Sequence, residues 1–335
     1  MLRLLTTLFS LALVVHSFAQ PPERRPPAAG APAVPIIFDT DMGPDYDDVG
    51  AITLLHALAD SGQARILATV ASTKYPRVGP VLSVLNTYFG RPNLPIAVPK
   101  GAAVDEGDRQ HWSDTLVARY PHRIRSNDAT PDAVPLYRQL LAREPDGSVT
   151  IVTVGFLTNL VNLLDSPADR YSPLPGRQLV QRKVKQLVCM AGAFPKGREF
   201  NVYKDVPAAQ KVYGEWPTPV LFSGFEIGEK IKTGIPLVQN AAIRNSPVKD
   251  VFRISIPLDK NDRDGRMSWD QTAVLVAVKG PAPYYTTVPG RITVQADGSN
   301  GWDPAGKGHA YLVEAWPVAQ TTALINRLMQ HQPKQ

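Results

Sequence analysis

Five aspartates lie within ten positions, at the end of a short apolar run. The run Ile36–Phe38 leads directly into the acidic positions, which are Asp39, Asp41, Asp45, Asp47 and Asp48. Carboxylates gathered at the end of a buried strand are costly to ionise unless a cation neutralises them. Because Ca²⁺ and Mg²⁺ prefer oxygen ligands, this segment predicts a site for a hard divalent cation.

Other motifs also place carboxylates close together. An EF-hand counted from Asp39 needs glycine at its sixth position and glutamate at its twelfth, where Pro44 and Gly50 stand, so that motif is excluded. A phosphatase of the haloacid-dehalogenase type begins with Asp-x-Asp after a strand, but Met42-Gly43 does not fit its continuation. Capping of a helix explains one or two of the aspartates, but not all five.

The elements that must position these residues alternate along the chain, as expected for a doubly wound, mainly parallel α/β sheet flanked by helices. The predicted strands are Pro35–Phe38, Arg65–Ala71, Leu94–Val98, Ser148–Val154, Lys185–Met190, Pro219–Ser223, Arg291–Gln295 and Ala310–Glu314. Helices are predicted after Asp48 and over Val78–Phe89, Leu157–Leu164, Ala208–Tyr213 and Trp269–Val278, with an irregular stretch over 100–132. In such sheets the binding crevice lies beyond the carboxyl ends of the strands, and the aspartates fall there.

The first 34 residues have a different composition from the rest of the chain. Residues 1–19 have a basic start, the apolar run Leu4–Val15 and a small-residue pair at Ser17 and Ala19, a pattern typical of a cleaved signal peptide. The run is shorter than the ~20 residues that a membrane span needs. We therefore expect an exported protein, periplasmic or secreted, with no stable membrane anchor. Residues 20–34 are predicted to be a proline-rich linker, and residues 35–330 one large domain.

Composition also excludes some partners. The single cysteine, Cys189, lies in an apolar run and is expected to be a buried strand residue, so the chain has no internal disulfide. The net charge is +6, but the basic residues are scattered rather than gathered in a stripe with aromatic residues. We therefore expect no nucleic-acid partner.

Several segments together are similar to the inosine–uridine-preferring nucleoside hydrolase family. The first is the acidic segment 39–51, which matches the family's N-terminal signature except for two extra residues before Asp47. The others follow in the family's order: Val154–Asn159, Met190–Ala193, Glu199-Phe200-Asn201, Asp205–Ala209 and Ser268-Trp269-Asp270. The resemblance runs from about Pro35 to Val278 and implies that the chain is a glycosidase of the same α/β fold.

The resemblance implies a Ca²⁺ cofactor and a role for each matched residue. The expected metal ligands are the side chains of Asp41, Asp48 and Asp270 and the backbone carbonyl of Val154. Asp41 is also expected to be the general base that activates a water. The expected substrate-binding residues are Asp47, Thr73, Glu199, Asn201 and Trp269. Asp39 is expected to support the loop, and Asp45 has no matched role.

The chain departs from the family where the leaving group would be protonated. Trp269 stands where the family has a histidine, and the candidates for a replacement acid are His111, His122 and His309. The resemblance implies Ca²⁺-dependent hydrolysis of a ribonucleoside, or a related N-riboside, to free base and ribose. The alternative is a Ca²⁺-dependent protein that binds ribose or nucleosides without turnover. A homo-oligomer is compatible with either.

Overall fold

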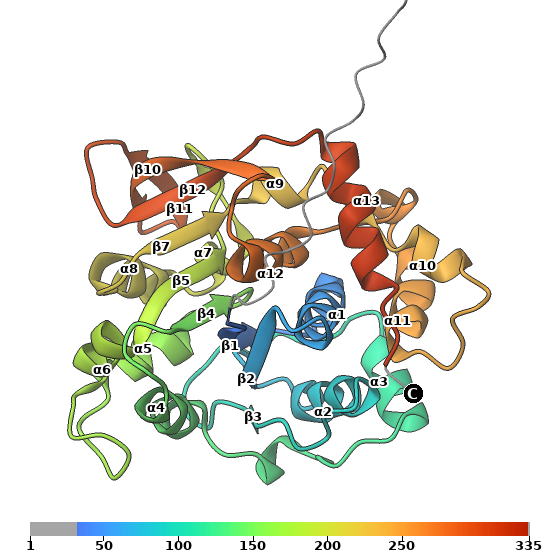
Figure 1. The fold of residues 1–335 in the computed structure, drawn as a ribbon, viewed down its shortest axis with the longest axis horizontal. Coiled ribbons are helices and arrows are strands. Elements are labelled where there is room, and N and C mark those ends of the chain that lie inside the picture. The colour runs from blue at the N-terminus through green and yellow to red at the C-terminus, as the bar shows by residue number, and fades with distance from the viewer. Residues whose placement is uncertain (1–31, 334–335) are drawn as a thin grey trace, which may run out of the picture. The chain divides into compact units, whose positions relative to one another are not determined.

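The computed structural model describes residues 32–333, so the predicted signal peptide and nearly all of the predicted linker lie outside the described residues. Ten strands form one sheet in the order β3-β2-β1-β4-β5-β7-β12-β10-β11-β6 (Figure 1). Their bounds are β1 (Val34–Thr40), β2 (Ala64–Ala71), β3 (Ile96–Ala97), β4 (Val149–Thr153), β5 (Val184–Met190), β6 (Gly197–Arg198), β7 (Val220–Ser223), β10 (Tyr285–Val294), β11 (Ser299–Asp303) and β12 (His309–Glu314). Every pairing from β3 to β12 is parallel, and the three beyond β12 are antiparallel. A separate two-stranded ribbon pairs β8 (Lys232–Thr233) with β9 (Arg266–Met267).

Helices cover both faces of the sheet (Figure 1). On one face lie α1 (Asp47–Asp60), α2 (Val78–Tyr88) and α12 (Trp269–Lys279), and α11 (Pro247–Ser255) and α13 (Val318–Met329) pack against α1 on the outside. On the other lie α4 (Ala133–Arg143), α5 (Thr158–Asp165), α6 (Gly176–Lys183) and α8 (Val206–Glu215). The remaining helices are α3 (Trp112–Arg119), α7 (Phe200–Lys204), α9 (Phe225–Gly228) and α10 (Ile235–Gln239).

The first strand shows why the core has two layers. Ile36 and Phe38 pack into the cluster that contains α1 and α12, whereas Ile37 packs into the cluster that contains α4 and α5. Successive side chains of a strand point to opposite faces, and all three are fully buried. A strand covered on both faces needs a continuous apolar run, which is what the sequence has here.

The order of the strands reverses beside β1. The chain winds outward from β1 to β2 and β3, then returns to β4 on the other side of β1 and continues to β5 and β7. Crossovers that lead away in opposite directions leave a crevice at the carboxyl ends of the two central strands. Asp41 follows β1 and Val154 follows β4, so both lie at this switch point.

The predicted fold class is confirmed, and the differences lie outside the central strands. The stretch predicted to be irregular contains α3, and the tail predicted to be β-rich ends in α13. The helices α4, α6 and α11 were not predicted. Cys189 is fully buried in β5, as predicted. Within residues 32–333 no helix has both the length and the apolar character to cross a membrane.

Candidate active site

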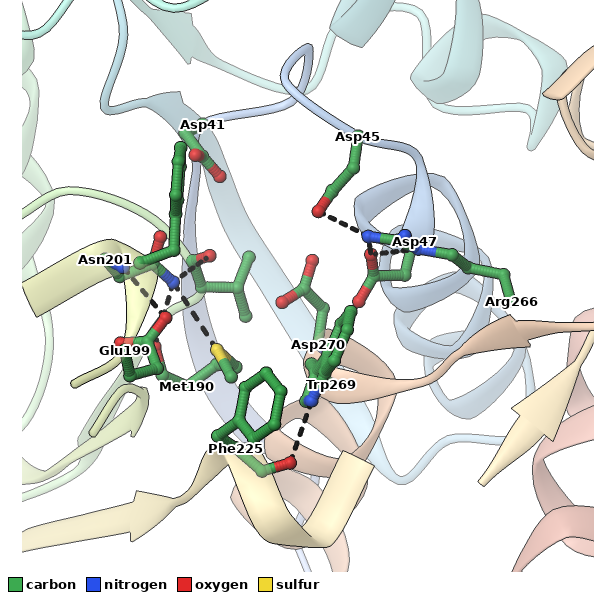
Figure 2. Close-up of a pocket in the computed structure, with 12 residues that line it drawn as sticks. Asp41, Asp45, Asp47, Met190, Glu199, Asn201, Phe225, Arg266, Trp269 and Asp270 are labelled. Atoms are coloured by element: carbon green, nitrogen blue, oxygen red, sulfur yellow. Dashed lines mark hydrogen bonds and ion pairs between the residues drawn. The ribbon is translucent and has the colours of Figure 1, made fainter. Parts of the chain in front are cut away.

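A cavity of about 250 Å³ opens at the switch point, beyond the ends of β1, β4, β5 and β7 (Figure 2). It is lined by Asp41, Asp45, Asp47, Val154, Met190, Glu199, Phe200, Asn201, Phe225, Arg266, Trp269 and Asp270. Five of these side chains are acidic and one, Arg266, is basic. The cavity therefore joins segments that are more than 200 residues apart in the sequence.

Three carboxylates meet at one corner of the site. One oxygen each from Asp45, Asp48 and Asp270 lies within 4.8 Å of the others. The hydroxyl of Thr40 donates a hydrogen bond to Oδ1 of Asp48, while Oδ2 of Asp48 is buried without a hydrogen-bond partner. An ionised oxygen left unpaired away from water is costly. This unpartnered oxygen, beside two further carboxylates, fits an oxygen-coordinated divalent cation.

Close packing of α1 against α12 brings Asp48 and Asp270 together. Both residues are in the first turn of their helix, where the positive end of the helix dipole favours negative charge. Gly50 makes the approach possible, because a Cβ at this position would lie 2.3 Å from Nε2 of the buried Gln271. The missing side chain at Gly50 therefore leaves room for Gln271 where α1 meets α12.

Arg266 supplies the only positive charge among the residues that line the cavity. Its Nε and Nη2 donate to Oδ1 of Asp47 at 3.1 and 3.0 Å, and Nη2 also donates to Oδ2 of Asp45 at 2.5 Å. The guanidinium lies 5.1 Å from the ring centroid of Tyr46 and 5.0 Å from that of Trp269. Arg266 thus holds two of the five aspartates in place and offsets part of their charge.

The loop that carries Asp41 rests on a buried carboxylate. Asp39 accepts hydrogen bonds from the Tyr137 hydroxyl at 2.7 Å and from Nδ2 of Asn159 at 3.0 Å. On the side of β4, Gly155 lets the chain approach closely, since a Cβ there would lie 2.6 Å from the Asp41 nitrogen. Asp39 therefore joins the end of β1 to α4 and α5, and it does not line the cavity.

The wall after β5 is organised by Glu199 and Asn201. The Glu199 carboxylate accepts from the backbone nitrogens of Gly192, Asn201 and Val202 at 3.0, 2.8 and 3.3 Å, which caps α7. Nδ2 of Asn201 donates to the carbonyl oxygen of Val154 at 3.0 Å. These bonds tie the end of β4 to the segment 190–202.

Burial is the largest cause of the raised pKa values in the acidic cluster. It raises the pKa of Asp47 and of Asp48 to about 7, and the neighbouring aspartates add to the effect. Burial and then the charges of nearby aspartates also raise the pKa of Asp41 and Asp270 well above the ordinary value. A divalent cation placed among these groups would favour their ionised forms instead.

An aromatic pair lines the side of the cavity away from Asp41 (Figure 2). The rings of Phe225 and Trp269 lie 5.1 Å apart between centroids, and the indole Nε1 of Trp269 donates to the carbonyl oxygen of Phe225 at 2.8 Å. Phe225 keeps 37% of its surface exposed. The cavity therefore has an acidic end and an apolar, aromatic end.

The structure brings most of the predicted site residues together. Those that line the cavity are Asp41, Asp47, Val154, Glu199, Asn201, Trp269 and Asp270. Asp48 does not line it, but one of its oxygens lies within 4.8 Å of an oxygen of Asp270. Asp41 is not in the trio of close carboxylates, where Asp45 stands instead, although the sequence analysis left Asp45 without a role.

Four other candidates lie elsewhere. The hydroxyl of Thr73 donates to the carbonyl oxygens of Val104 and Glu106 and does not line the cavity, so we drop Thr73 as a ribose contact. His111, His122 and His309 do not line it either, and His309 packs against Phe222.

Sequence reasoning also missed residues that the site contains. No sequence pattern pointed to Arg266, because its partners Asp45 and Asp47 lie about 220 residues earlier in the chain. Phe225 follows β7 in a segment without a recognisable motif. Met190 belongs to a segment that the resemblance had marked, and its place at the end of β5 points to the crevice.

Comparison with known protein sequences identifies the family. A family model described as inosine-uridine preferring nucleoside hydrolase matches residues 36–321. The pyrimidine-specific ribonucleoside hydrolase RihA of Citrobacter koseri is 28% identical over 236 residues, 65% of this chain and 69% of that protein. RihA of Salmonella paratyphi B is 31% identical over 217 residues, 59% of this chain and 62% of that protein.

Solved structures of nucleoside hydrolases share the fold. The plant enzyme PpNRh1 superposes with a TM-score of 0.67 at 21% identity and covers 89% of this chain and 99% of its own. The purine-preferring ribonucleoside hydrolase of Gardnerella vaginalis has a TM-score of 0.69 at 17% identity and covers 88% and 99%. At these identities the similarity establishes the architecture alone.

Proposed function

The chain belongs to the inosine-uridine preferring nucleoside hydrolase family, and from this premise we propose that it hydrolyses the N-glycosidic bond of a ribonucleoside, or a related N-riboside, with Ca²⁺ as cofactor. The products are the free base and ribose. The observation that carries the proposal is the unpartnered Oδ2 of Asp48 beside Asp45 and Asp270, two residues that line the same cavity as Asp41.

The residues present fit a calcium ion. Asp48 and Asp270 are the core of the proposed ligand set, and Asp41 and the carbonyl of Val154 face the same cavity. Asp45 adds a fourth carboxylate. Oxygen ligands in this number suit Ca²⁺, which takes six to eight of them in flexible geometry. When bound, the ion orients ribose hydroxyls and makes a coordinated water more acidic.

Asp41 is the proposed general base. Its carboxylate lines the cavity together with Asp45 and Asp270, and a bound Ca²⁺ would keep it ionised and able to accept a proton. It takes the proton of the water that attacks the anomeric carbon as the bond to the base breaks. The transition state resembles an oxocarbenium ion, and the acidic end of the cavity stabilises that positive charge.

Side chains around the acidic end hold the sugar. Asp47 is oriented by Arg266 and by the backbone nitrogen of Asp270, which donates to its Oδ2 at 3.3 Å. Glu199 and Asn201 form the opposite wall and are proposed to contact the far side of the ribose. Because backbone groups fix these side chains before substrate arrives, little reorganisation is needed on binding.

A panel of ribosides tests the proposal. Purified protein is incubated with each compound and Ca²⁺, and the reducing sugar released is measured before and after removal of the metal by a chelator. We expect release that stops with the chelator and returns with added Ca²⁺. Ca²⁺-dependent binding without release from any riboside would support a binding protein instead.

Export is a separate proposal, which rests on the composition of residues 1–19. Expression of the full chain in bacteria followed by fractionation should place it outside the cytoplasm, with a new N-terminus near residue 20. Recovery of full-length chain from the cytoplasmic fraction would contradict this.

A further inference from the structure

Tyr46 and Asp262 form a buried hydrogen-bonded pair that takes no part in the chemistry proposed above. Tyr46 directly precedes α1, and Asp262 ends the 3₁₀ helix Lys260–Asp262. Neither residue is exposed, and the Tyr46 hydroxyl donates to Oδ2 of Asp262 at 2.6 Å. Within residues 32–333, Oδ1 of Asp262 is buried without a hydrogen-bond partner. A buried carboxylate that is only half satisfied is costly, so the pair calls for a role.

Arg266 contacts both this pair and the acidic side chains of the cavity. Its guanidinium donates two hydrogen bonds to Oδ1 of Asp47 and one to Asp45 (Figure 2). Its Nη1 lies 3.8 Å from Oδ2 of Asp262, which is beyond hydrogen-bond distance. The same Oδ2 accepts the Tyr46 hydroxyl. Arg266 therefore has a third acidic neighbour to which it is not bonded.

The backbone of Arg266 is fixed, so only its side chain can choose among these carboxylates. Arg266 pairs with Thr233 in the ribbon of β8 and β9. Gly265 has a φ of +111° and packs so closely on Thr233 that a Cβ would lie 2.6 Å from the Thr233 carbonyl oxygen. The Gly265 nitrogen also donates to the carbonyl oxygen of Asp262 at 2.8 Å. This turn keeps Asp262 within reach of the guanidinium, whichever carboxylate the guanidinium binds.

Tyr46 touches the guanidinium with its ring and the Asp262 carboxylate with its hydroxyl. The guanidinium carbon lies 5.1 Å from the centroid of the Tyr46 ring, and Phe252 packs edge-on against the same ring at 5.1 Å. Burial, followed by the hydrogen bond to Asp262, raises the pKa of Tyr46, so the hydroxyl keeps its proton and donates. Tyr46 also belongs to the stretch before Asp47 that is two residues longer than in the family signature.

The position of the guanidinium decides how Asp47 is held. Oδ1 of Asp47 accepts both bonds from Arg266, and Oδ2 accepts from the backbone nitrogen of Asp270 at 3.3 Å. A guanidinium that moved to Asp262 would leave Asp47 with the longest of these three bonds. Asp47 lines the cavity and is proposed to hold the sugar. A carboxylate that is free to rotate loses the preorganisation that favours binding.

We propose that Tyr46 is a positioning residue, whose hydroxyl occupies Asp262 and thereby keeps Arg266 bonded to Asp47 and Asp45. Asp262 is then a competitor for the guanidinium rather than its support. Without the hydroxyl, neither oxygen of Asp262 has a hydrogen-bond partner, and a buried charge in that state attracts the nearest cation. The proposal rests on the hydrolase function proposed above and adds a residue outside the cavity that orients a sugar-binding carboxylate.

Crystal structures of three metal-free variants test the competition without any measurement of activity. Tyr46→Phe removes the hydroxyl and keeps the ring, and we expect Nη1 of Arg266 within hydrogen-bond distance of Asp262, with at least one bond to Asp47 lost. In Asp262→Asn, and in the double variant, the guanidinium should keep both bonds to Asp47. A guanidinium that stays on Asp47 in Tyr46→Phe, or that leaves it in Asp262→Asn, would overturn the proposal.

Kinetics in saturating Ca²⁺, with the riboside that the wild type cleaves fastest, test the consequence for the sugar. Tyr46→Phe should raise KM by roughly 10- to 100-fold. It should change kcat less, because the guanidinium binds Asp47 and Asp45 rather than the proposed base Asp41. Adding Asp262→Asn should recover most of the loss in KM, whereas two merely structural losses would add. A double variant with a higher KM than Tyr46→Phe would overturn the proposal.

Tyr88→Phe is the matched control, because its hydroxyl donates to Gln332 and Tyr88 does not line the cavity. It should keep the wild-type KM, and an equal rise in Tyr88→Phe and Tyr46→Phe would contradict a specific role for Tyr46. Thermal unfolding checks that each variant is folded. No hydrolysis of any riboside by folded, Ca²⁺-loaded wild type would contradict the hydrolase function itself, and the crystallographic test would still decide the role of Tyr46.

Discussion

Arg266 and Asp47 are joined by two hydrogen bonds to a single carboxylate oxygen, from Nε at 3.1 Å and from Nη2 at 3.0 Å. The same guanidinium reaches Asp45 and lies 3.8 Å from Asp262. Both residues of the pair are almost fully buried. One internal cation therefore holds Asp47 and Asp45, and Asp45 is itself one of the three carboxylates at the proposed metal position.

Replacing Arg266 with methionine should destabilise the protein. The variant keeps much of the side-chain volume but leaves Asp47 and Asp45 without their partner, and breaking a buried ion pair costs roughly 3–5 kcal/mol. Urea unfolding in the absence of metal measures the change, and added Ca²⁺ should restore part of it. Arg182→Met is the control, because Arg182 pairs with Asp146 at the exposed surface. Equal stability of the Arg266→Met variant and the wild type would contradict the role given to Arg266.

Metal-free protein should lose stability as the pH rises. Burial raises the pKa of Asp39, Asp47, Asp48 and Glu199 to about 7, whereas in the unfolded chain carboxyls titrate near 4. Between about pH 4 and pH 7 the folded state then binds more protons than the unfolded chain. The stability that these four groups contribute is therefore fully present below about pH 4 and is lost as the pH rises to about 7. Other groups add their own acid dependence, so the comparison is best made between pH 5.5 and 8.

Calcium should reverse that trend. Ca²⁺ binds the ionised carboxylates, so the rise in melting temperature on adding Ca²⁺ should be larger at pH 8 than at pH 5.5. Thermal unfolding at the two pH values, with chelator and with Ca²⁺, measures both effects. A Ca²⁺ shift that is equal at both pH values would argue against an ion held by these groups.

Asp45→Asn should weaken Ca²⁺ binding by roughly tenfold or more, by removing one charge from the trio with Asp48 and Asp270. Isothermal titration calorimetry of the metal-free protein measures the affinity. Asp128→Asn is the matched control at an exposed position and should bind as the wild type does. Unchanged affinity in Asp45→Asn would show that Asp45 serves only Arg266.

Gly50→Ala should impair the site through packing alone. The new methyl group would overlap Gln271 and push α1 away from α12, at a cost of about 1–3 kcal/mol. Asp48 and Asp270 would move apart, so Ca²⁺ affinity should fall together with stability. Gly101→Ala, where nothing lies within 4 Å of the added Cβ, should change neither. A drop in stability without any loss of Ca²⁺ affinity would mean that the helix contact does not set the metal geometry.

The strands that build the crevice could be predicted because each is covered on both faces. The structure has β1, β2, β4, β5 and β7 within two residues of the predicted bounds at either end, since continuous apolar runs leave little choice of element. The helix α4 was missed because Pro135 in its first turn suggests a loop, and because its buried face includes Arg138 and Tyr137 rather than aliphatic residues alone. The helix α3 has only eight residues and little apolar periodicity.

The site could be predicted only where a local motif marks the residue. Asp48 and Asp270 lie in the first turns of helices, and recognisable motifs mark both positions. Asp45 and Arg266 have meaning only as a pair, and 221 residues separate them. No local pattern reports such a contact. Thr73 shows the opposite case, in which a residue in a suitable sequence position does not reach the cavity. It follows the end of β2, but its hydroxyl is bonded to the 104–106 segment.

The most direct measurement is the rate of sugar release by Asp41→Asn in saturating Ca²⁺, with Asp165→Asn at an exposed position as its control. Calorimetry and thermal unfolding first establish that the variant folds and binds the metal. The account predicts a loss of roughly 100- to 10,000-fold in kcat for Asp41→Asn and wild-type activity for the control. Release at the wild-type rate by folded, Ca²⁺-bound Asp41→Asn would contradict it.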